Sequence, residues 1–351
     1  MISSLRKTIL WLQNKTVWRS SVLNSWMSGT SMLVFSLGCI LGLVSPAAHA
    51  AKQDPVTCSA SMTGGINFGT VNVLTTANTD VTGSLDVQCQ SNVRQNYYVT
   101  VCFNIGDGMN PSSAGNRVML NGASPLSYQL YQDAARSQVW GSVSSTHYPN
   151  PVRLDFFLGA RQTFTQTLPV YARLLGSQNT AATGFYQDSY VNPQVQITGV
   201  LTYSYGSGSC DQSGQDAGLF SSFNVTANVA SNCLVSATNL NFGSASVLNT
   251  MVSSTSNVGV QCTNGTAYQI GLSAGQHAVG GNRNMSSGAS LITYGLYQDA
   301  AHVQPWDSVA NQKNGVGTGL TSNQTVFGLV PVQPSVPAGS YADTVQVIVS
   351  Y

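Results

Sequence analysis

The most informative stretch of the sequence is Tyr128-Gln129-Leu130-Tyr131-Gln132-Asp133-Ala134-Ala135, which recurs as Tyr294-Gly295-Leu296-Tyr297-Gln298-Asp299-Ala300-Ala301. Each copy continues to a tryptophan, Trp140 or Trp306. Four further blocks recur in the same order: Ile66-Asn67-Phe68-Gly69 with Leu240-Asn241-Phe242-Gly243, Val87-Gln88-Cys89 with Val260-Gln261-Cys262, Asn116-Arg117-x-Met119 with Asn282-Arg283-x-Met285, and Gly184-x-Tyr186-x-Asp188 with Gly339-x-Tyr341-x-Asp343. Such ordered matches indicate a duplicated chain, and units of roughly 120 to 180 residues have the length of whole domains.

Both copies have the residue pattern of β-strands. Val99, Val101 and Phe103 alternate with polar residues, and so do the valines near the end of the second copy, while clusters of Gly, Asn, Asp and Pro separate such runs. Alternation with a period of two predicts strands with one buried face. Many short strands between polar turns are typical of a β-sandwich. We therefore predict an all-β protein with two tandem sandwich domains.

The first fifty residues have the pattern of an export signal. Four basic residues, Arg6, Lys7, Lys15 and Arg19, precede an apolar run from Met32 to Val44. Ala48 and Ala50 fit the small-residue cleavage rule, so we expect the mature chain to begin at Ala51. A membrane anchor is the alternative, but thirteen apolar residues are fewer than the roughly 20 that a spanning helix needs. Lipid modification of Cys39 is a weaker alternative, because more apolar sequence follows it.

The cysteines predict disulfides. Six cysteines follow Ala51: Cys58, Cys89, Cys102, Cys210, Cys233 and Cys262. An even number of cysteines in an exported chain favours disulfides over free thiols. Because Cys58 and Cys89 occupy the places of Cys233 and Cys262 in the second copy, we pair each copy's own two, which leaves Cys102 with Cys210. No Cys-x-x-Cys pair points to zinc or redox use.

Composition excludes several classes of function. The chain contains no Glu, and after the four basic leader residues are removed, nine Lys and Arg stand against twelve Asp, a net charge of −3. Such a chain has no basic surface for nucleic acid. Without Glu, and without a Gly-x-Ser-x-Gly turn, the common acid, base and nucleophile motifs are missing, and His147, His277 and His302 lack the spacing of metal ligands. We expect neither an enzyme nor a cofactor.

The order of these motifs resembles the spore coat U domain. The resemblance rests on a cysteine before a Leu-Asn-Phe-Gly segment, then Val-Gln-Cys, Tyr-x-Leu-Tyr-Gln-Asp, a tryptophan and a final Gly-x-Tyr-x-Asp segment. It covers essentially all of residues 223–351 and is looser in the first copy between Trp140 and Gly184 and beyond Tyr205. The family includes subunits of archaic, Csu-type chaperone-usher pili. It implies immunoglobulin-like sandwiches that lack a last strand, which a periplasmic chaperone and later an adjacent pilin subunit supply.

The C-terminal copy is expected to have such an open groove. It ends in the segment 344–351, an alternating strand with nothing after it to close the sandwich, so we assign Val345, Val347 and Val349 to the groove that accepts a donor strand. The seven residues before Cys58 contain Pro55 and no alternating apolar row, so they offer no donor strand. The resemblance therefore implies a two-domain tip subunit that passes through an outer-membrane usher and lies at the pilus tip on the cell surface.

A segment between the copies alternates in the same way. Phe223, Val225, Ala227 and Val229 alternate with other residues ahead of Cys233. We hypothesise that residues 219–231 complete the first sandwich in cis, after a Gly- and Ser-rich turn; the alternative is that they form the first strand of the second copy. The expected organisation is a signal peptide at 1–50, an adhesin-like domain at 51–218, a linker or cis donor strand at 219–231, and a pilin domain at 232–351.

The first copy has the longer loops and therefore carries the candidate adhesive residues. Loops on a rigid scaffold usually carry binding, and the resemblance implies apolar loops that attach to abiotic or host surfaces in biofilm formation. We select five apolar candidates: Tyr148, Pro149, Pro151, Val152 and Leu154. Phe156, Phe157 and Leu158 are assigned to a core strand instead. Loops near 109–111 and 174–183 are weaker candidates.

The sequence is compatible with two functions other than adhesion through apolar loops. A lectin-like tip would bind a glycan through Tyr97, Tyr98, Trp140 and Asp155. A surface or matrix protein outside any fibre would need no chaperone. The residues shared by both copies, Asp133 with Asp299 and Trp140 with Trp306, are better explained as turn and packing residues, because the second copy is expected to be structural.

Overall fold

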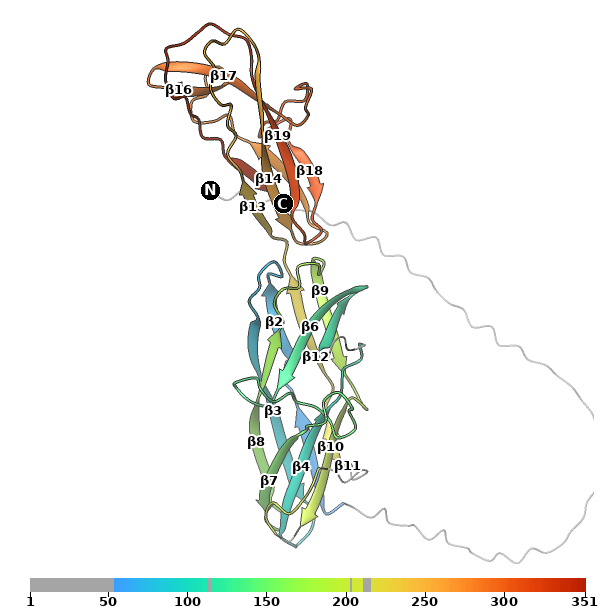
Figure 1. The fold of residues 1–351 in the computed structure, drawn as a ribbon. Helices are drawn as coiled ribbons and strands as arrows, with labels where there is room; N and C mark the ends of the chain where they lie inside the picture. The colour runs from blue at the N-terminus through green and yellow to red at the C-terminus, as the bar shows by residue number, and fades with distance from the viewer. Residues whose placement is uncertain (1–53, 111, 113–114, 203, 211–215) are drawn as a thin grey trace, which may run out of the picture. The chain divides into compact units, whose positions relative to one another are not determined.

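The structure, a computed structural model, describes residues 54–110, 112, 115–202, 204–210 and 216–351 (Figure 1). The expected leader and Cys39 lie outside these residues. The described part of the chain contains twenty β-strands and no helix, so the all-β prediction is confirmed.

The first domain contains twelve strands: β1 (Val56–Ser61), β2 (Ile66–Val71), β3 (Thr79–Ser91), β4 (Tyr97–Ile105), β5 (Arg117–Asn121), β6 (Ser124–Tyr131), β7 (Val152–Leu158), β8 (Thr163–Leu174), β9 (Gly184–Tyr190), β10 (Val195–Thr202), β11 (Asp216–Phe220) and β12 (Phe223–Val229). They form one hydrogen-bonded sheet in the order β2-β12-β9-β5-β6-β8-β3-β1-β11-β10-β4-β7. Alternate residues of these strands meet in a single hydrophobic core. The sheet is folded over so that two of its parts face each other across this core, which is the arrangement of a sandwich.

The second domain contains eight strands: β13 (Cys233–Ala237), β14 (Val252–Cys262), β15 (Ala267–Leu272), β16 (Arg283–Ser287), β17 (Ser290–Tyr297), β18 (Lys313–Val316), β19 (Ser322–Val330) and β20 (Val347–Ser350). They form a five-stranded sheet, β13-β14-β19-β17-β16, and a three-stranded sheet, β18-β15-β20. Side chains from both sheets share one core around the fully buried Trp306.

The described residues contain three disulfides, and they are the pairs deduced from the duplication. Cys58–Cys89 joins β1 to β3, and Cys233–Cys262 joins β13 to β14; the Cα atoms are 4.1 Å apart in each. In both pairs the two cysteines lie directly opposite each other in the antiparallel ladder. The third bridge, Cys102–Cys210, occurs in the first domain alone.

The other duplicated residues have matching structural roles in the two domains. The indole Nε1 of Trp140 donates to the carbonyl of Phe103, and that of Trp306 donates to the carbonyl of Ile270. Arg117 and Arg283 each donate to the carbonyl of their own domain's tryptophan. The carboxylates of the two matched aspartates accept backbone N–H groups of the turns that follow them: Asp133 from Ser137 and Gln138, and Asp299 from Val303 and Gln304. These contacts fit turn and packing roles.

Candidate functional site

The segment between the two copies belongs to the first sandwich. β12 pairs parallel with β2, Val225 lying opposite Ile66, and antiparallel with β9, Phe223 lying opposite Tyr190. The side chains of Phe223, Val225, Ala227 and Val229 are all buried in the core of the first domain. Within the described residues β12 pairs with no strand of the second domain, which supports closure of the first sandwich in cis over the alternative that the segment begins the second copy.

The strand before β12 extends the same closure. β11 pairs parallel with β1 and antiparallel with β10, and it begins at Asp216, earlier than the expected boundary at Leu219. A Cβ on Gly218 would overlap the Cys58 carbonyl, so only glycine allows β11 to approach β1 this closely. Residues 216–229 thus close the first domain in two places, with β11 between β1 and β10 and β12 between β2 and β9.

The second domain has a groove where the first domain has β12. The groove has a volume of about 620 Å³ and lies between residues 240–248 and residues 335–341, with Val252, Met285, Ile292 and Val330 also lining it. Residues 240–243 and 339–343 are the duplicated counterparts of β2 and β9, the two neighbours of β12. The groove therefore lies at the position of the closing strand.

The walls of this groove are not β-strands in the structure. Residues 240–243 and 339–343 form no ladder, although their counterparts in the first domain are strands. The segment Gly339-x-Tyr341-x-Asp343 thus differs in conformation from its counterpart β9 and makes only an isolated bridge, between Ala342 and Ser286. The reason is physical: in the first domain these segments pair with β12, and a strand without its neighbour lacks the ladder hydrogen bonds that hold it extended.

Val345, Val347 and Val349, predicted to form the acceptor groove, lie on or next to strand β20. Val347 and Val349 belong to β20, which pairs with β15, and Val345 precedes that strand. All three are half-buried side chains that pack against the core of the second domain. They do not line the groove itself. Because β20 pairs with β15 as β10 pairs with β4, β20 is the counterpart of β10, along which β11 lies in the first domain. The assignment of these three residues to the acceptor surface therefore stays a prediction.

Strand β13 of the second domain also lacks the neighbour that covers its counterpart β1. In the first domain β1 is covered by β11, and Ala60 on β1 is buried. Within the described residues β13 pairs with β14 alone, and Leu234 and Val235 are 47% and 45% exposed. Two large apolar side chains are thus exposed at the positions of Ser59 and Ala60. A strand that followed the course of residues 216–229 would cover them.

The five adhesive candidates of the first domain differ in how far their side chains are exposed. Tyr148, expected to be exposed, is buried and lies against the Arg117 guanidinium, 4.4 Å from its ring centroid. The prediction failed because Arg117, distant in sequence, provides a cation for the ring to cover. Pro149 is exposed and Pro151 is half-buried. Val152 and Leu154 are half-buried residues of strand β7 and not of a loop.

A different set of aromatic residues is exposed in the first domain. Phe157, assigned to the core, is 53% exposed, because β7 is an edge strand whose alternate residues Phe156 and Leu158 face the core. Its ring packs edge-on against Tyr98, at 5.4 Å between centroids, and Tyr98 in turn packs against Tyr205, which is 67% exposed. We call Tyr98, Phe157 and Tyr205 the aromatic patch.

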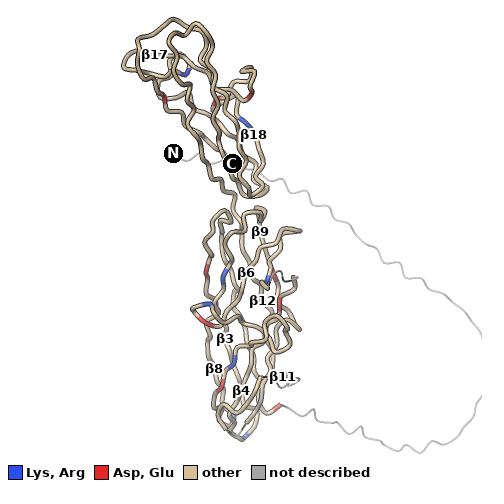
Figure 2. The backbone as a smooth tube through the Cα atoms, viewed as in Figure 1, with Lys and Arg blue, Asp and Glu red and all other residues tan. Residues whose placement is uncertain are grey.

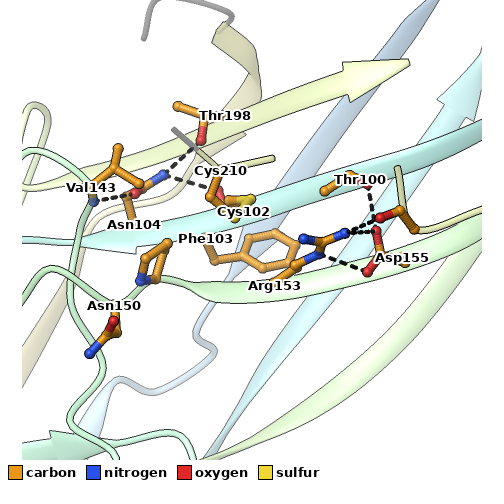
Figure 3. The surroundings of a disulfide bond; sticks show 12 residues. Thr100, Cys102, Phe103, Asn104, Val143, Asn150, Arg153, Asp155, Thr198 and Cys210 are labelled. Atoms are coloured by element: carbon orange, nitrogen blue, oxygen red, sulfur yellow. Dashed lines mark hydrogen bonds and ion pairs between the residues drawn. A yellow bond between two sulfur atoms is a disulfide. The ribbon is translucent and has the colours of Figure 1, made fainter. Parts of the chain in front are cut away.

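The residues proposed for a lectin pocket are only partly brought together: Tyr97, Tyr98 and Asp155 lie on the paired strands β4 and β7, and Trp140 lies in the core. Trp140 is buried and donates its Nε1 to a backbone carbonyl, so it cannot stack on a sugar, and that assignment is wrong. Asp155 is bound by Arg153 and Thr100, as Figure 3 shows. Tyr97 and Tyr98 are half-buried. Figure 2 shows how few charged residues line the described backbone.

The pKa values of two matched aspartates, Asp188 and Asp343, shift in opposite directions. Burial raises the pKa of Asp188 above its usual value, despite hydrogen bonds from the Tyr128 hydroxyl and the backbone N–H of Asn110. Burial also acts to raise the pKa of its counterpart Asp343, but hydrogen bonds from Tyr294 and His277 outweigh it and lower that pKa. The pKa values differ because the Asp343 carboxylate has a hydrogen bond to the His277 imidazole, in addition to the one from a tyrosine hydroxyl that both aspartates accept.

Opposite pH dependences are therefore expected from the two aspartates. The stability that Asp188 contributes is fully present below its unfolded pKa of about 3.9 and is lost as pH rises through the raised folded pKa. The contribution of Asp343 is present above about pH 4 and is lost as pH falls through its lowered pKa. Denaturant unfolding of Asp188→Asn and Asp343→Asn between pH 3 and 7 measures both. Parallel changes relative to wild type would contradict this assignment.

Neither a metal site nor a membrane span is found in the part of the chain that the structure describes. No three His, Cys or Asp side chains there are close enough to hold a metal ion together. None of the described residues belongs to a helix that could cross a membrane.

Comparison with known proteins identifies the domain. No curated protein sequence is significantly similar to the chain. In structure, the chain is similar to a protein from the chaperone–tip adhesion subunit pre-assembly complex of archaic chaperone-usher Csu pili of Acinetobacter baumannii, with 17% identity, 84% of this chain and 100% of that chain covered, and a TM-score of 0.47. It is also similar to the CupB6 tip adhesin of Pseudomonas aeruginosa, with 10% identity, 84% and 93% covered, and a TM-score of 0.33.

The family model of the Spore Coat Protein U domain matches twice, over residues 46–191 and 219–348. The first match lies in the first copy, and the second covers the second copy together with residues 219–231, which the structure pairs with the first sandwich. A coat-protein domain is structural, so the prediction that the chain is not an enzyme is confirmed. Since the two matches together span most of its length, the chain belongs to the Spore Coat Protein U domain family.

Proposed function

We propose that the chain is the tip adhesin subunit of an archaic chaperone-usher pilus. The observation that carries the proposal is the difference between the two copies. In the first domain the place of the closing strand is taken by β12, whereas in the second domain it is an open groove. The chain would therefore accept one strand from a partner and would need none for its first domain.

The groove gives a physical reason for each partner. It exposes apolar side chains and backbone groups without ladder partners, which an added strand satisfies together. A fully buried Val or Phe side chain contributes roughly 1.5–3 kcal/mol. The first domain buries three such side chains from β12, Phe223, Val225 and Val229, together with Ala227. A periplasmic chaperone would supply the strand before assembly, and the adjacent subunit would supply it after passage through the usher.

The first domain would make the contact with a surface. Its sandwich is complete, so it can be presented at the end of a fibre without a neighbour. The aromatic patch offers two strongly exposed rings, Phe157 and Tyr205, held in place by Tyr98. Exposed aromatic surface binds apolar material by its removal from water, which fits attachment to abiotic surfaces in biofilm formation.

Replacing both Phe157 and Tyr205 with Ser tests this surface. Loss of the two rings is expected to reduce attachment of piliated cells to polystyrene by roughly 10-fold or more, because most of the apolar contact area is removed. The matched control is Phe185→Ser, which removes a ring that is 57% exposed elsewhere in the same domain. Attachment is counted on cells whose piliation is equal by electron microscopy.

Three outcomes separate the alternatives. Unchanged attachment of the double variant would remove the aromatic patch from the proposal. Competition by soluble sugars but not by detergent would favour the lectin-like tip. A mature chain that folds and is exported without any chaperone would favour a surface or matrix protein outside a fibre.

A further inference from the structure

The Cys102–Cys210 disulfide marks a place where the first domain differs from the second. Cys102 lies on β4 between Val101 and Phe103, both fully buried in the core, so the cysteine side chain faces the opposite side of the sheet. The counterpart strand β15 has Gln269 at this position. Figure 3 shows the bridge with Asn104 and Thr198 on one side and the Thr100, Arg153 and Asp155 group on the other.

The bridge lies level with the start of β11. Thr198 on β10 is opposite Cys102 of β4 on one side and Asp216 of β11 on the other. The Asn104 side chain links β4 to β10 at this level, since its Nδ2 donates to the Cys102 carbonyl and to Thr198 Oγ1. The disulfide thus holds Cys210 against Cys102, at the level of the sheet where the first residue of β11, Asp216, pairs with β10.

The chain just before Cys210 is also held against the sheet. Arg153 donates to the carbonyl of Gly206, and the Tyr205 ring packs on Tyr98. A Cβ on Gly208 would overlap the Thr100 hydroxyl, so the backbone runs directly over β4 at this point. These contacts and the disulfide fix residues 204–210 immediately ahead of the closing strands.

We propose that this disulfide is a clamp that keeps β11 and β12 in the first domain's own groove and prevents their exchange with a second copy of the chain. The proposal rests on the proposed role of β12 as the closing strand. β11 and β12 are the last strands of the first domain, so they can leave it while the other strands stay paired. When the bridge is absent, the vacated groove accepts the same segment from another copy, as in domain swapping.

The side chains of residues 216–229 indicate that the strand entering a vacated first-domain groove would come from a second copy of the chain. Phe220, Phe223, Val225 and Val229 fill the first domain's core when the segment is in place. A second copy carries the same side chains in the same order, with Gly218 again at the close approach to Cys58. The clamp acts by keeping the chain's own strand at high local concentration.

The test compares the chain from Ala51 with its Cys102→Ser/Cys210→Ser variant, and with Cys233→Ser/Cys262→Ser as the matched control. Hydrogen exchange of residues 216–229 is expected to be roughly 10-fold faster or more in the first variant, with β3 and β8 unchanged. The same variant, refolded at high concentration, is expected to form dimers by light scattering, while the control stays monomeric.

Two results would overturn the clamp. One is equal acceleration of exchange across all strands of the first domain, which is what a bridge that only stabilises the fold would give. The other is a variant that stays monomeric with normal protection of residues 216–229. Chaperone capture through the second domain is measured on the same preparations, so a failure of the clamp is separable from a failure of the proposed pilus role.

Discussion

Replacing Val225 with Asp is expected to unfold the first domain while leaving the second folded. Val225 is fully buried in the middle of β12. It lies opposite Ile66 on one neighbouring strand and opposite the buried Asp188 on the other. A carboxylate here would be desolvated, without a cation, and beside another carboxyl group. An unpaired buried charge costs roughly 3–5 kcal/mol, a large part of the stability of a single domain.

Hydrogen exchange in increasing denaturant, read by mass spectrometry, follows the two domains in one sample. Exchange at β3 and β8 reports on the first domain, and exchange at β14 and β19 reports on the second. The control is Asn224→Asp, which adds the same charge to an exposed position of the same strand. If the free energy of unfolding of the first domain changed by the same amount in both variants, β12 would not be part of its fold.

The second large effect is expected at the groove of the second domain. Val336 lines the groove and is half-buried. Its replacement by Asp places a charge where a donor strand would bury apolar side chains. A penalty of about 2 kcal/mol corresponds to a loss of roughly 30-fold in affinity for the chaperone. Co-purification of the periplasmic chaperone with the tagged chain measures this loss.

Val332→Asp is the matched control for this substitution. Val332 lies four residues away in the same segment, is 60% exposed and does not line the groove. The control is expected to capture the chaperone as the wild type does. Equal capture by the Val336 and Val332 variants would mean that the chaperone binds elsewhere on the chain.

The duplication made much of the fold predictable. The matched blocks located both domains, and the places of Cys58, Cys89, Cys233 and Cys262 within them gave the disulfide pairs that the structure contains. The alternation from Phe223 to Val229 predicted a strand, and β12 is that strand. Local patterns and internal repeats were sufficient here because each depends on residues close in sequence or on a second copy.

Exposure and grooves depend instead on residues far apart in sequence. The ring of Tyr148 is buried by Arg117, and Phe157 is exposed because β7 lies at the edge of its sheet. The members of the aromatic patch, Tyr98, Phe157 and Tyr205, come from three separate segments.

The groove lined by residues 240–248 and 335–341 was not predicted, for a related reason. A groove is defined by the strand that is missing, so the pattern of the residues around it does not mark it. The duplication did contain a usable signal, since residues 240–243 and 339–343 are the counterparts of the two strands that flank β12. Aligning the copies around β12 would have added these two segments to the acceptor surface predicted from the last alternating strand.

Photo-cross-linking from within the groove tests most directly whether the second domain accepts a partner strand. A photoreactive residue in place of Ala338, which lines the groove and is exposed, is compared with one in place of Val332, which does not line it. We predict adducts from position 338 to a strand of the chaperone in the periplasm and to a strand of the adjacent subunit in assembled fibres, with none from position 332. Assembled fibres that give no adduct from position 338, or equal adducts from both positions, would contradict the proposal.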